Sequence, residues 1–278
     1  MLGSNRDEFF ERPTQPAGFQ TTGTGKSDIF MPIDLGRPEH GTWMGITRDG
    51  RICVLVNYKE PPAKCVGAVS RGVMARDFLE HGVRGKAEEW VHAAELRMAD
   101  EGFVNVGGFS LLFGDIDGDL WVLSNRGPNK LVKVLNKKSF GDDRHLDNQS
   151  ILGLSNSAVN EPWPKVLKGV AMFEEVIAQA QSVDEIDDEW LISKVNTVMR
   201  TRCGAFAQEQ YPNLFIEAMD APIGDERSLA STIFVPPLKA GDAGLYGTRT
   251  QCVVLVKDDG TVIYAEENRR VSFRIEHH

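Results

Sequence analysis

The residues best suited to carry chemistry lie near the two ends of this sequence. The run Asn5-Arg6-Asp7-Glu8 stands between a short apolar lead and the pair Phe9-Phe10, which should anchor it to a core. Near the other end, the guanidinium of Arg249 can bind a carboxylate through two parallel hydrogen bonds, either that of Asp7 or that of an acidic ligand. An internal salt bridge explains Arg249 equally well. On spacing alone, a solvated turn explains the first run as well as a site does.

Three asparagines place amide groups at the ends of predicted strands. Asn57, Asn125 and Asn156 each follow an apolar run. A buried amide both donates and accepts hydrogen bonds, so neighbouring backbone or a ligand must satisfy it. For Asn57 and Asn125 we favour backbone contacts at the strand end, and for Asn156 we keep both roles open.

Repeated hairpin patterns predict the antiparallel sheet that would position these residues. Apolar runs 43–47 and 52–57 flank Asp49-Gly50, runs 109–114 and 120–125 flank Asp117-Gly118, and runs 251–257 and 261–266 flank Asp259-Gly260. An Asp-Gly pair supplies the positive φ values that a tight turn between two strands needs. We also predict a strand over residues 231–235. The stretch 15–40 is rich in Gly and Pro, so we expect a surface connection with only short extended pieces there.

Helical periodicity predicts helices over residues 70–81, 86–99, 165–181 and 188–200. Ser70 is available as the N-cap of the first. The apolar stripes of these helices indicate a core rather than a cofactor site. Because the hairpins do not alternate strand by strand with helices, the order of elements indicates an α+β fold.

Composition and charge limit the domain count and the partners. The 278 residues are 41% hydrophobic and 26% charged, and no composition break divides them, so we expect one soluble domain over residues 1–278. The net charge of −9 argues against nucleic acid and anionic lipid, which bind clustered Lys and Arg. No stretch approaches the roughly 20 apolar residues of a transmembrane segment, and we see no export signal.

The cysteines do not form a recognisable metal site. Cys53, Cys65, Cys203 and Cys252 stand far apart and include no C-x-x-C pair. We therefore expect reduced thiols, no metal and no disulfides. Nothing else in the sequence indicates a cofactor.

Six motifs, found in order, resemble the transport and Golgi organization protein 2 family, also known as the NRDE family. They are Asn5-Arg6-Asp7-Glu8-Phe9 with Arg12-Pro13-Thr14, Gly41-Thr42-Trp43-Met44-Gly45-Ile46, Val56-Asn57-Tyr58, Ser124-Asn125-Arg126-Gly127, Gly153-Leu154-Ser155-Asn156-Ser157 before Pro162-Trp163-Pro164-Lys165, and Tyr246-Gly247-Thr248-Arg249-Thr250. The resemblance covers nearly the whole chain. It implies a fold similar to N-terminal nucleophile (Ntn) hydrolases, a four-layer αββα sandwich of two stacked antiparallel sheets with helices outside.

The resemblance also implies where a site would lie. In acylase-like Ntn hydrolases, an N-terminal Cys, Ser or Thr attacks an amide beside an Arg and an Asp, with an Asn on a later strand and a further Arg. The residues that match those places are Arg6, Asp7, Asn156 and Arg249. For ligand binding the expected set adds Asn5 and Asn57. We expect an acidic amphipathic small molecule, because Arg6 and Arg249 supply positive charge on an acidic protein.

The chain departs from the family pattern at the nucleophile. Family members begin Met-Cys, followed by one strand and then a second strand that runs into the Asn-Arg-Asp-Glu motif. In this chain the second residue is Leu2, and only four residues precede Asn5. We therefore expect N-terminal strands to be missing or truncated. We also expect the chain as written to be non-catalytic, with Ser4 a nucleophile only after unusual trimming.

Three functions from different classes follow from this reading. The first is a non-catalytic cytoplasmic protein associated with the Golgi or mitochondria. The family implies for it a role in Golgi organization and protein secretion, or in handling an amphipathic molecule such as haem or a lipid. The second is an Ntn-type amidohydrolase that cleaves the C–N bond of a small acyl amide, if an upstream Cys exists. The third is a purely structural interaction protein, if side chains fill the cavity around Arg6 and Arg249.

Overall fold

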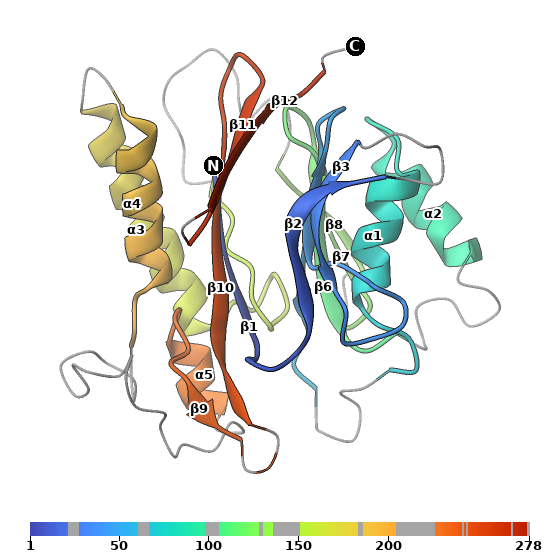
Figure 1. Cartoon of the computed structure of the whole chain (residues 1–278), viewed down its shortest axis with the longest axis horizontal. Helices are drawn as coiled ribbons and strands as arrows, with labels where there is room; N and C mark the ends of the chain where they lie inside the picture. Colours follow the sequence, from blue (N-terminus) through green and yellow to red (C-terminus); the bar gives the residue numbers. More distant parts are fainter. Residues whose placement is uncertain are drawn as a thin grey trace. The chain divides into compact units, whose positions relative to one another are not determined.

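The chain forms two compact units in the computed structural model (Figure 1). The described residues are 1–21, 28–60, 67–97, 106–127, 130–135, 151–182, 186–203, 226–240, 242, 244–267 and 269–276. The first unit joins Met1–Arg12 to Pro162–Arg274, and the second joins Pro13–Glu161 to Ile275–His278. Each unit has its own antiparallel sheet.

The first unit is built on a five-stranded antiparallel sheet. Its strands are β1 (Leu2–Phe9), β9 (Leu238–Lys239), β10 (Leu245–Val256), β11 (Thr261–Glu266) and β12 (Arg269–Arg274). They follow the order β1-β10-β11-β12, and β9 also pairs with β10. The helices of this unit are α3 (Pro164–Gln181), α4 (Asp188–Met199) and α5 (Glu226–Ser231), and Figure 1 shows α3 and α4 running side by side next to the sheet.

Apolar residues of α4 pack on this sheet. One core cluster consists of Ile192, Val195, Met199, Val253, Leu255 and Ile263. Gly3 of β1 permits the close approach, since a Cβ there would lie 2.7 Å from Cγ1 of Val195 and 2.9 Å from Sδ of Met199. Packing, rather than backbone conformation, therefore requires glycine at this position.

The second unit is built on a seven-stranded antiparallel sheet in the order β2-β3-β4-β5-β6-β7-β8. The strands are β2 (Thr14–Gln20), β3 (Ile29–Asp34), β4 (Met44–Thr47), β5 (Arg51–Asn57), β6 (Phe109–Asp115), β7 (Leu120–Ser124) and β8 (Leu131–Leu135). Two helices, α1 (Gly72–His81) and α2 (Ala87–Arg97), cover it. The rings of Phe78, Trp90 and Phe113 join both helices to the sheet, with centroids 5.0 to 5.1 Å apart.

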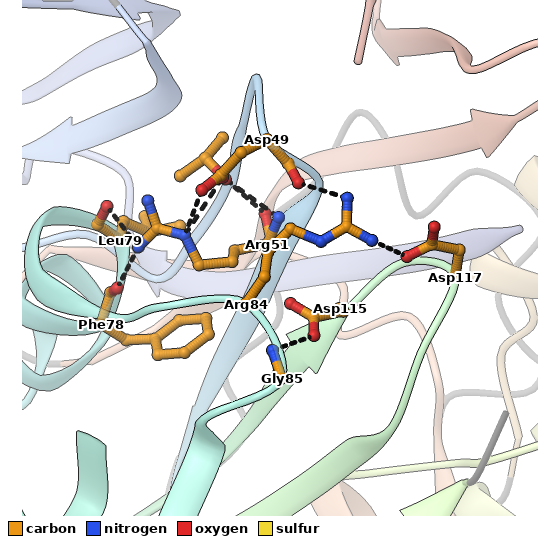
Figure 2. Close-up of polar contacts among 9 residues, drawn as sticks. Asp49, Arg51, Phe78, Leu79, Arg84, Gly85, Asp115 and Asp117 are labelled. Carbon is orange, nitrogen blue, oxygen red and sulfur yellow. Dashed lines mark hydrogen bonds and ion pairs between the residues drawn. The ribbon is translucent and has the colours of Figure 1, made fainter. Parts of the chain in front are cut away.

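Two arginines tie the turns of the second unit to α1 and to each other (Figure 2). Nη1 of Arg51 donates to two of the last carbonyl oxygens of α1, 2.9 and 3.1 Å away. The last carbonyl groups of a helix have no partner within it, so this guanidinium satisfies them. Arg84 donates to the carbonyl oxygen of Asp49 at 2.8 Å and to the carboxylate of Asp117. These contacts hold two hairpin turns in place.

The three predicted hairpins are confirmed. β4 pairs with β5, β6 with β7 and β10 with β11, each antiparallel. In the first and last turns, φ is positive at glycine only, 88° at Gly50 and 79° at Gly260. The expectation that Asp49 and Asp259 share this conformation is wrong, because a turn that closes on one left-handed glycine needs no second such residue.

Residues 15–40 contain two strands of the sheet, so the expected surface connection is wrong. β2 pairs antiparallel with β3, and the register shifts between Gln15 and Gly18. Pro16, which has no N–H to donate, lies within that shift. β2 stands at the end of the sheet order, where a proline is tolerated.

The strand predicted over residues 231–235 is also wrong. α5 ends at Ser231, and the backbone that follows bonds to groups outside a ladder. The N–H of Phe234 donates to the carbonyl oxygen of Thr201 at 2.9 Å. The N–H of Val235 donates to the hydroxyl of Thr248 at 2.8 Å. This apolar run is therefore an irregular core segment.

The predicted helices correspond to α1 to α4, with α2 described as far as Arg97. The N-cap of α1 is Arg71 rather than Ser70, although Oγ of Ser70 still accepts a hydrogen bond from the N–H of Gly72 at 3.3 Å. The fold is α+β, as predicted, with helices on antiparallel sheets. The stacking of the sheets into four αββα layers and the single domain over residues 1–278 stay predictions.

Candidate functional site

The candidate residues of the first unit lie on β1 and β10, which are neighbouring antiparallel strands. In the ladder Arg6 is opposite Thr250, and Asp7 is opposite Thr248. Arg249 is thus the extra residue of a β-bulge, an irregularity that bends a strand and changes the direction of a side chain. The ladder therefore brings the Asn5–Asp7 run and the Thr248–Thr250 run side by side.

The side chain of Asn5 joins three segments of the first unit. Its Nδ2 donates to the carbonyl oxygens of Met199 at 2.8 Å and Ile233 at 3.0 Å. Its Oδ1 accepts a hydrogen bond from Nε2 of Gln251 at 3.0 Å. Met199 ends α4 and Gln251 lies on β10, so the Asn5 amide connects a helix end to the sheet. These contacts give Asn5 a structural role.

Asp7 is oriented by its neighbour across the ladder. The hydroxyl of Thr248 accepts from the N–H of Val235 and donates to Oδ1 of Asp7 at 2.6 Å. Burial raises the pKa of Asp7, while the ammonium of Lys165 and the hydrogen bond from Thr248 act in the opposite direction. The carboxylate of Asp7 is therefore a stronger proton acceptor than an exposed aspartate.

Arg249 holds the turn that follows β1. Its Nη1 donates to the carbonyl oxygens of Phe9, at 3.4 Å, and Arg12. The alternative in which Arg249 pairs with Asp7 is wrong within the described part of the chain, where Thr248 is the donor to Asp7. The physical reason is the bulge, which directs the guanidinium toward the turn.

Arg6 is buried beside a carboxylate of its own strand. It is 9% exposed, and its Nη2 lies 3.8 Å from Oε2 of Glu8. Nε of Arg12 lies 3.5 Å from the same oxygen. One carboxylate thus faces two guanidinium groups, and at 3.8 Å the contact with Arg6 is electrostatic rather than a hydrogen bond.

Lys165 is a candidate residue that our sequence analysis did not place in the site. It is the second residue of α3 and is 8% exposed. Its Nζ lies 5.5 Å from the centroid of the Trp163 ring. Burial lowers the pKa of Lys165, and the nearby charge of Asp7 opposes this change. The ammonium of Lys165 therefore loses its proton more readily than that of an exposed lysine.

The sequence does carry a signal for Lys165. The first turn of a helix has a positive potential from the aligned peptide dipoles, so a cation is unfavourable there. Lys165 comes directly after Pro164, the first residue of α3, and so occupies such a position. Helical periodicity alone assigns it to the helix and gives no sign of its burial.

Two candidate asparagines lie in the second unit. Asn57 ends β5 with an exposed side chain that makes no hydrogen bond to any described residue, and its expected backbone contact stays a prediction. The backbone oxygen of Asn156 accepts from the N–H of Lys59 at 2.8 Å, which brings its segment beside the chain that follows β5. Oδ1 of Asn156 accepts from the hydroxyl of Ser155 at 3.3 Å.

The structural role expected for Asn125 is confirmed. Its Oδ1 accepts from the N–H of Phe109 at 2.9 Å, and its Nδ2 donates to the carbonyl oxygen of Val106 at 3.1 Å. Nε of the adjacent Arg126 donates to Oε1 of the buried Glu60 at 2.6 Å. Together these groups fix the backbone that leads into β6.

Two of the described thiols, those of Cys53 and Cys252, are poor nucleophiles. Burial raises the pKa of Cys252 to about 12, and burial also raises the pKa of Cys53. Cys65 lies outside the described residues. Across the described ranges, no group of His, Cys, Asp and Glu side chains is placed to hold a metal ion. No described helix combines the length and apolar character needed to span a bilayer.

Comparison with known proteins identifies the family. The Transport and Golgi organization protein 2 homolog of Homo sapiens is 28% identical over 280 residues, covering 96% of this chain and 86% of that protein. The homolog of Bos taurus is 27% identical over 275 residues, with the same shares covered. A solved variant of the conjugated bile acid hydrolase of Clostridium perfringens is 13% identical with a TM-score of 0.45, covering 98% of this chain and 88% of that chain. The sequence model of the family described as Transport and Golgi organisation 2 matches residues 1–270, and the chain belongs to that family.

Proposed function

We propose that the protein is a non-catalytic member of its family that takes part in Golgi organization and protein secretion by binding an acidic amphipathic small molecule, such as haem or a lipid. The family description and the names of the relatives support the role at the Golgi. We propose a cytoplasmic location in association with the Golgi. Those names give no support for an association with mitochondria.

The observation that carries the binding proposal is the pair of buried cations in the first unit. Arg6 is 9% exposed and Lys165 is 8% exposed, in a chain whose net charge is −9. Removing a cation from water is unfavourable unless an anion compensates for the lost solvation. Within the described residues, the ammonium of Lys165 has no anion bonded to it. An acidic head group would supply one.

This proposal assigns the ligand contacts to Arg6, Asp7 and Lys165. The side chains of Asn5 and Arg249 hold backbone carbonyl groups, so we assign them to the support of β1 and β10. Asn57 and Asn156 stay predictions as ligand contacts.

The Ntn-type amidohydrolase is the alternative, and its nucleophile would be an upstream Cys or, after unusual trimming, Ser4 of β1. Ser4 is the one hydroxyl residue of β1, which contains no Cys or Thr. In the ladder Ser4 is opposite Cys252. We expect no turnover when a panel of acyl amides is incubated with the purified chain. Turnover that the substitution Ser4→Ala abolishes would favour the amidohydrolase.

Ligand titrations of two variants test the binding proposal. Haemin and oleate are the probes, and Kd is measured at pH 7 for the wild-type chain, Arg6→Met and Arg274→Met. Arg6→Met should weaken binding by about 10- to 100-fold, the effect of losing a hydrogen bond to a charged group. Arg274 is an exposed arginine at the end of β12, so Arg274→Met should leave Kd unchanged. Equal weakening by both substitutions, or no binding of either probe to the wild-type chain, would contradict the proposal.

A further inference from the structure

The last strand of the first unit carries three arginines around a serine. β12 consists of Arg269-Arg270-Val271-Ser272-Phe273-Arg274. Arg269 and Arg270 are the only two adjacent arginines in the sequence. In the described part of the sheet β12 pairs with β11 alone, beside which Figure 1 shows it, and it ends the order β1-β10-β11-β12. The serine therefore lies on a strand that is held from one side.

Alternation along β12 places Ser272 on the same face as Arg270 and Arg274. Successive side chains of a strand point to opposite faces, so residues two apart share a face at a spacing of about 7 Å. The contacts agree with this. Ser272 is opposite Ile263, whose side chain packs on α4, and Nη1 of Arg270 donates to Oε1 of Glu189 in the first turn of α4. Two guanidinium groups thus flank one hydroxyl.

Ser272 is accessible, and the ion pairs of its neighbours are weak. Its side chain is exposed and makes no hydrogen bond to any described residue. Nη2 of Arg274 donates to Oδ2 of Asp259 at 3.1 Å. Both arginines and their partners Glu189 and Asp259 are exposed, and exposed ion pairs contribute little to stability. A stronger anion can therefore replace either carboxylate.

The order of residues in β12 matches the substrates of basophilic serine kinases. Such a kinase binds an extended chain, holds arginines that precede the serine with its own carboxylates, and places the next residue in an apolar pocket. Arg269 and Arg270 stand three and two positions before Ser272, and Phe273 follows it. The backbone of β12 is already extended.

Phe273 sets a condition for this recognition. Its side chain is buried in the sheet, so it has to leave β11 before a kinase can hold it. Opening one terminal strand of a sheet requires less free energy than unfolding the whole domain. β12 has a single partner strand in the described chain, which makes it such a strand.

We propose that Ser272 is phosphorylated by a basophilic kinase and that Arg270 and Arg274 then hold the phosphate. This goes beyond the proposed function, because it concerns an edge of the sheet rather than the ligand. Oγ of Ser272 bonds to the γ-phosphorus of ATP, the bond from that phosphorus to its bridging oxygen breaks, and ADP leaves. The hydroxyl proton passes to the catalytic aspartate of the kinase.

The phosphate changes the partners of the two arginines. A phosphoserine carries about −1.5 to −2 charges at pH 7 and three acceptor oxygens, so it binds guanidinium groups more strongly than a carboxylate does. Glu189 and Asp259 are exposed and return to water when they lose their arginines. Asp188 keeps a cation, because Nζ of Lys257 lies 2.8 Å from its Oδ2. The modification thus separates β12 from the first turn of α4.

Phosphorylation of the folded full chain tests the inference directly. The chain is incubated with MgATP and the catalytic subunit of cAMP-dependent protein kinase, and mass spectrometry locates the phosphate. We expect phosphate on Ser272, absent in Ser272→Ala and kept in Ser193→Ala. Ser193 is an exposed serine of α4 with no arginine in the three residues before it. No phosphate on Ser272, or phosphate there only after heating above the melting temperature, would overturn the inference.

Two variants separate recognition of the arginine from loss of its ion pair. Arg270→Gln should slow phosphorylation of Ser272 about 10- to 100-fold, since it removes a charged hydrogen bond to the kinase. Glu189→Gln breaks the same ion pair but keeps the arginine, so it should be phosphorylated at least as fast as the wild-type chain. Equal slowing in both variants would overturn the assignment of Arg270 to recognition.

The ionisation of the phosphate tests the role of Arg274. The second pKa of phosphoserine is ordinarily about 6, and guanidinium groups that favour the dianion should lower it. Phosphorus NMR measures this pKa in the phosphorylated chain. Arg274→Gln keeps both arginines that precede Ser272, so it should still be phosphorylated, with a pKa nearer 6. The same pKa in both chains would overturn the role of Arg274.

Discussion

Asp7 and Lys165 are two ionisable residues whose charged forms are disfavoured by burial. Burial raises the pKa of Asp7 and lowers the pKa of Lys165, and each group opposes the change in the other. In both cases burial favours the neutral form, so the folded chain destabilises the ionised form of each side chain. Groups perturbed in this way gather at functional sites, because well-packed apolar residues would stabilise the fold better.

The raised pKa of Asp7 predicts a specific dependence of stability on pH. The folded state holds the Asp7 proton more tightly than the unfolded state, so the contribution of Asp7 falls as the pH rises from the unfolded pKa through the folded one. Asp7→Asn removes this loss and should therefore melt at a higher temperature than the wild-type chain at pH 7. The difference should shrink as the pH falls toward 4.

The control for that melting experiment is an exposed aspartate of the same unit. Asp258 lies in the turn between β10 and β11, and Asp258→Asn should leave the melting temperature unchanged at pH 7. A lower melting temperature for Asp7→Asn across the whole pH range would show that the ionised carboxylate stabilises the fold. That result would make Asp7 a structural residue.

At the scale of elements, β1 is held by contacts with distant parts of the chain. Asn5 bonds to carbonyl groups 194 and 228 residues away along the sequence. Gly3 admits two α4 side chains to within 2.7 and 2.9 Å of the position its Cβ would take. The strand that carries Arg6 and Asp7 is therefore positioned by α4 and β10 together.

Replacement of Asn5 by alanine should lower stability rather than ligand affinity. Asn5→Ala strands the carbonyl oxygens of Met199 and Ile233, and unsatisfied buried groups cost about 1–3 kcal/mol. Urea unfolding measures this loss, with the exposed Asn160→Ala as the control that should show none. If Asn5→Ala instead weakens haemin binding at unchanged stability, Asn5 has the ligand role that the sequence predicted.

Local patterns in the sequence predict some elements well and others poorly. The Asp-Gly pairs at Gly50 and Gly260 mark hairpins because the signal lies within a few residues of the turn. The sequence analysis does not predict β2, because Pro16 by itself indicates a loop. A proline is compatible with a strand at the edge of a sheet, and that position depends on the whole sheet order. The resemblance to the family predicts Arg6 and Asp7 as residues of the candidate site. The contacts of Asn5 and the burial of Lys165 depend on segments far along the chain, which no local pattern contains.

At the scale of the whole molecule, the chain passes between the two units three times. It crosses after Arg12, after Glu161 and after Arg274. The first unit thus joins the N-terminal segment to residues 162–274, so its sheet forms only after long-range closure between β1 and β10. This path favours joint folding, and the single domain over residues 1–278 stays a prediction.

The substitution Gly3→Ala tests whether the two units unfold as one domain. The added Cβ would lie 2.7 Å from Cγ1 of Val195, and overpacking of this kind costs about 1–3 kcal/mol. In one cooperative domain, amides of β5 and β6 in the second unit should lose as much protection from hydrogen exchange as those of β10 and β11. Gly18→Ala is the matched strand control, because nothing lies within 4 Å of its added Cβ. Loss of protection confined to β1, β10 and β11 would show that the units unfold separately.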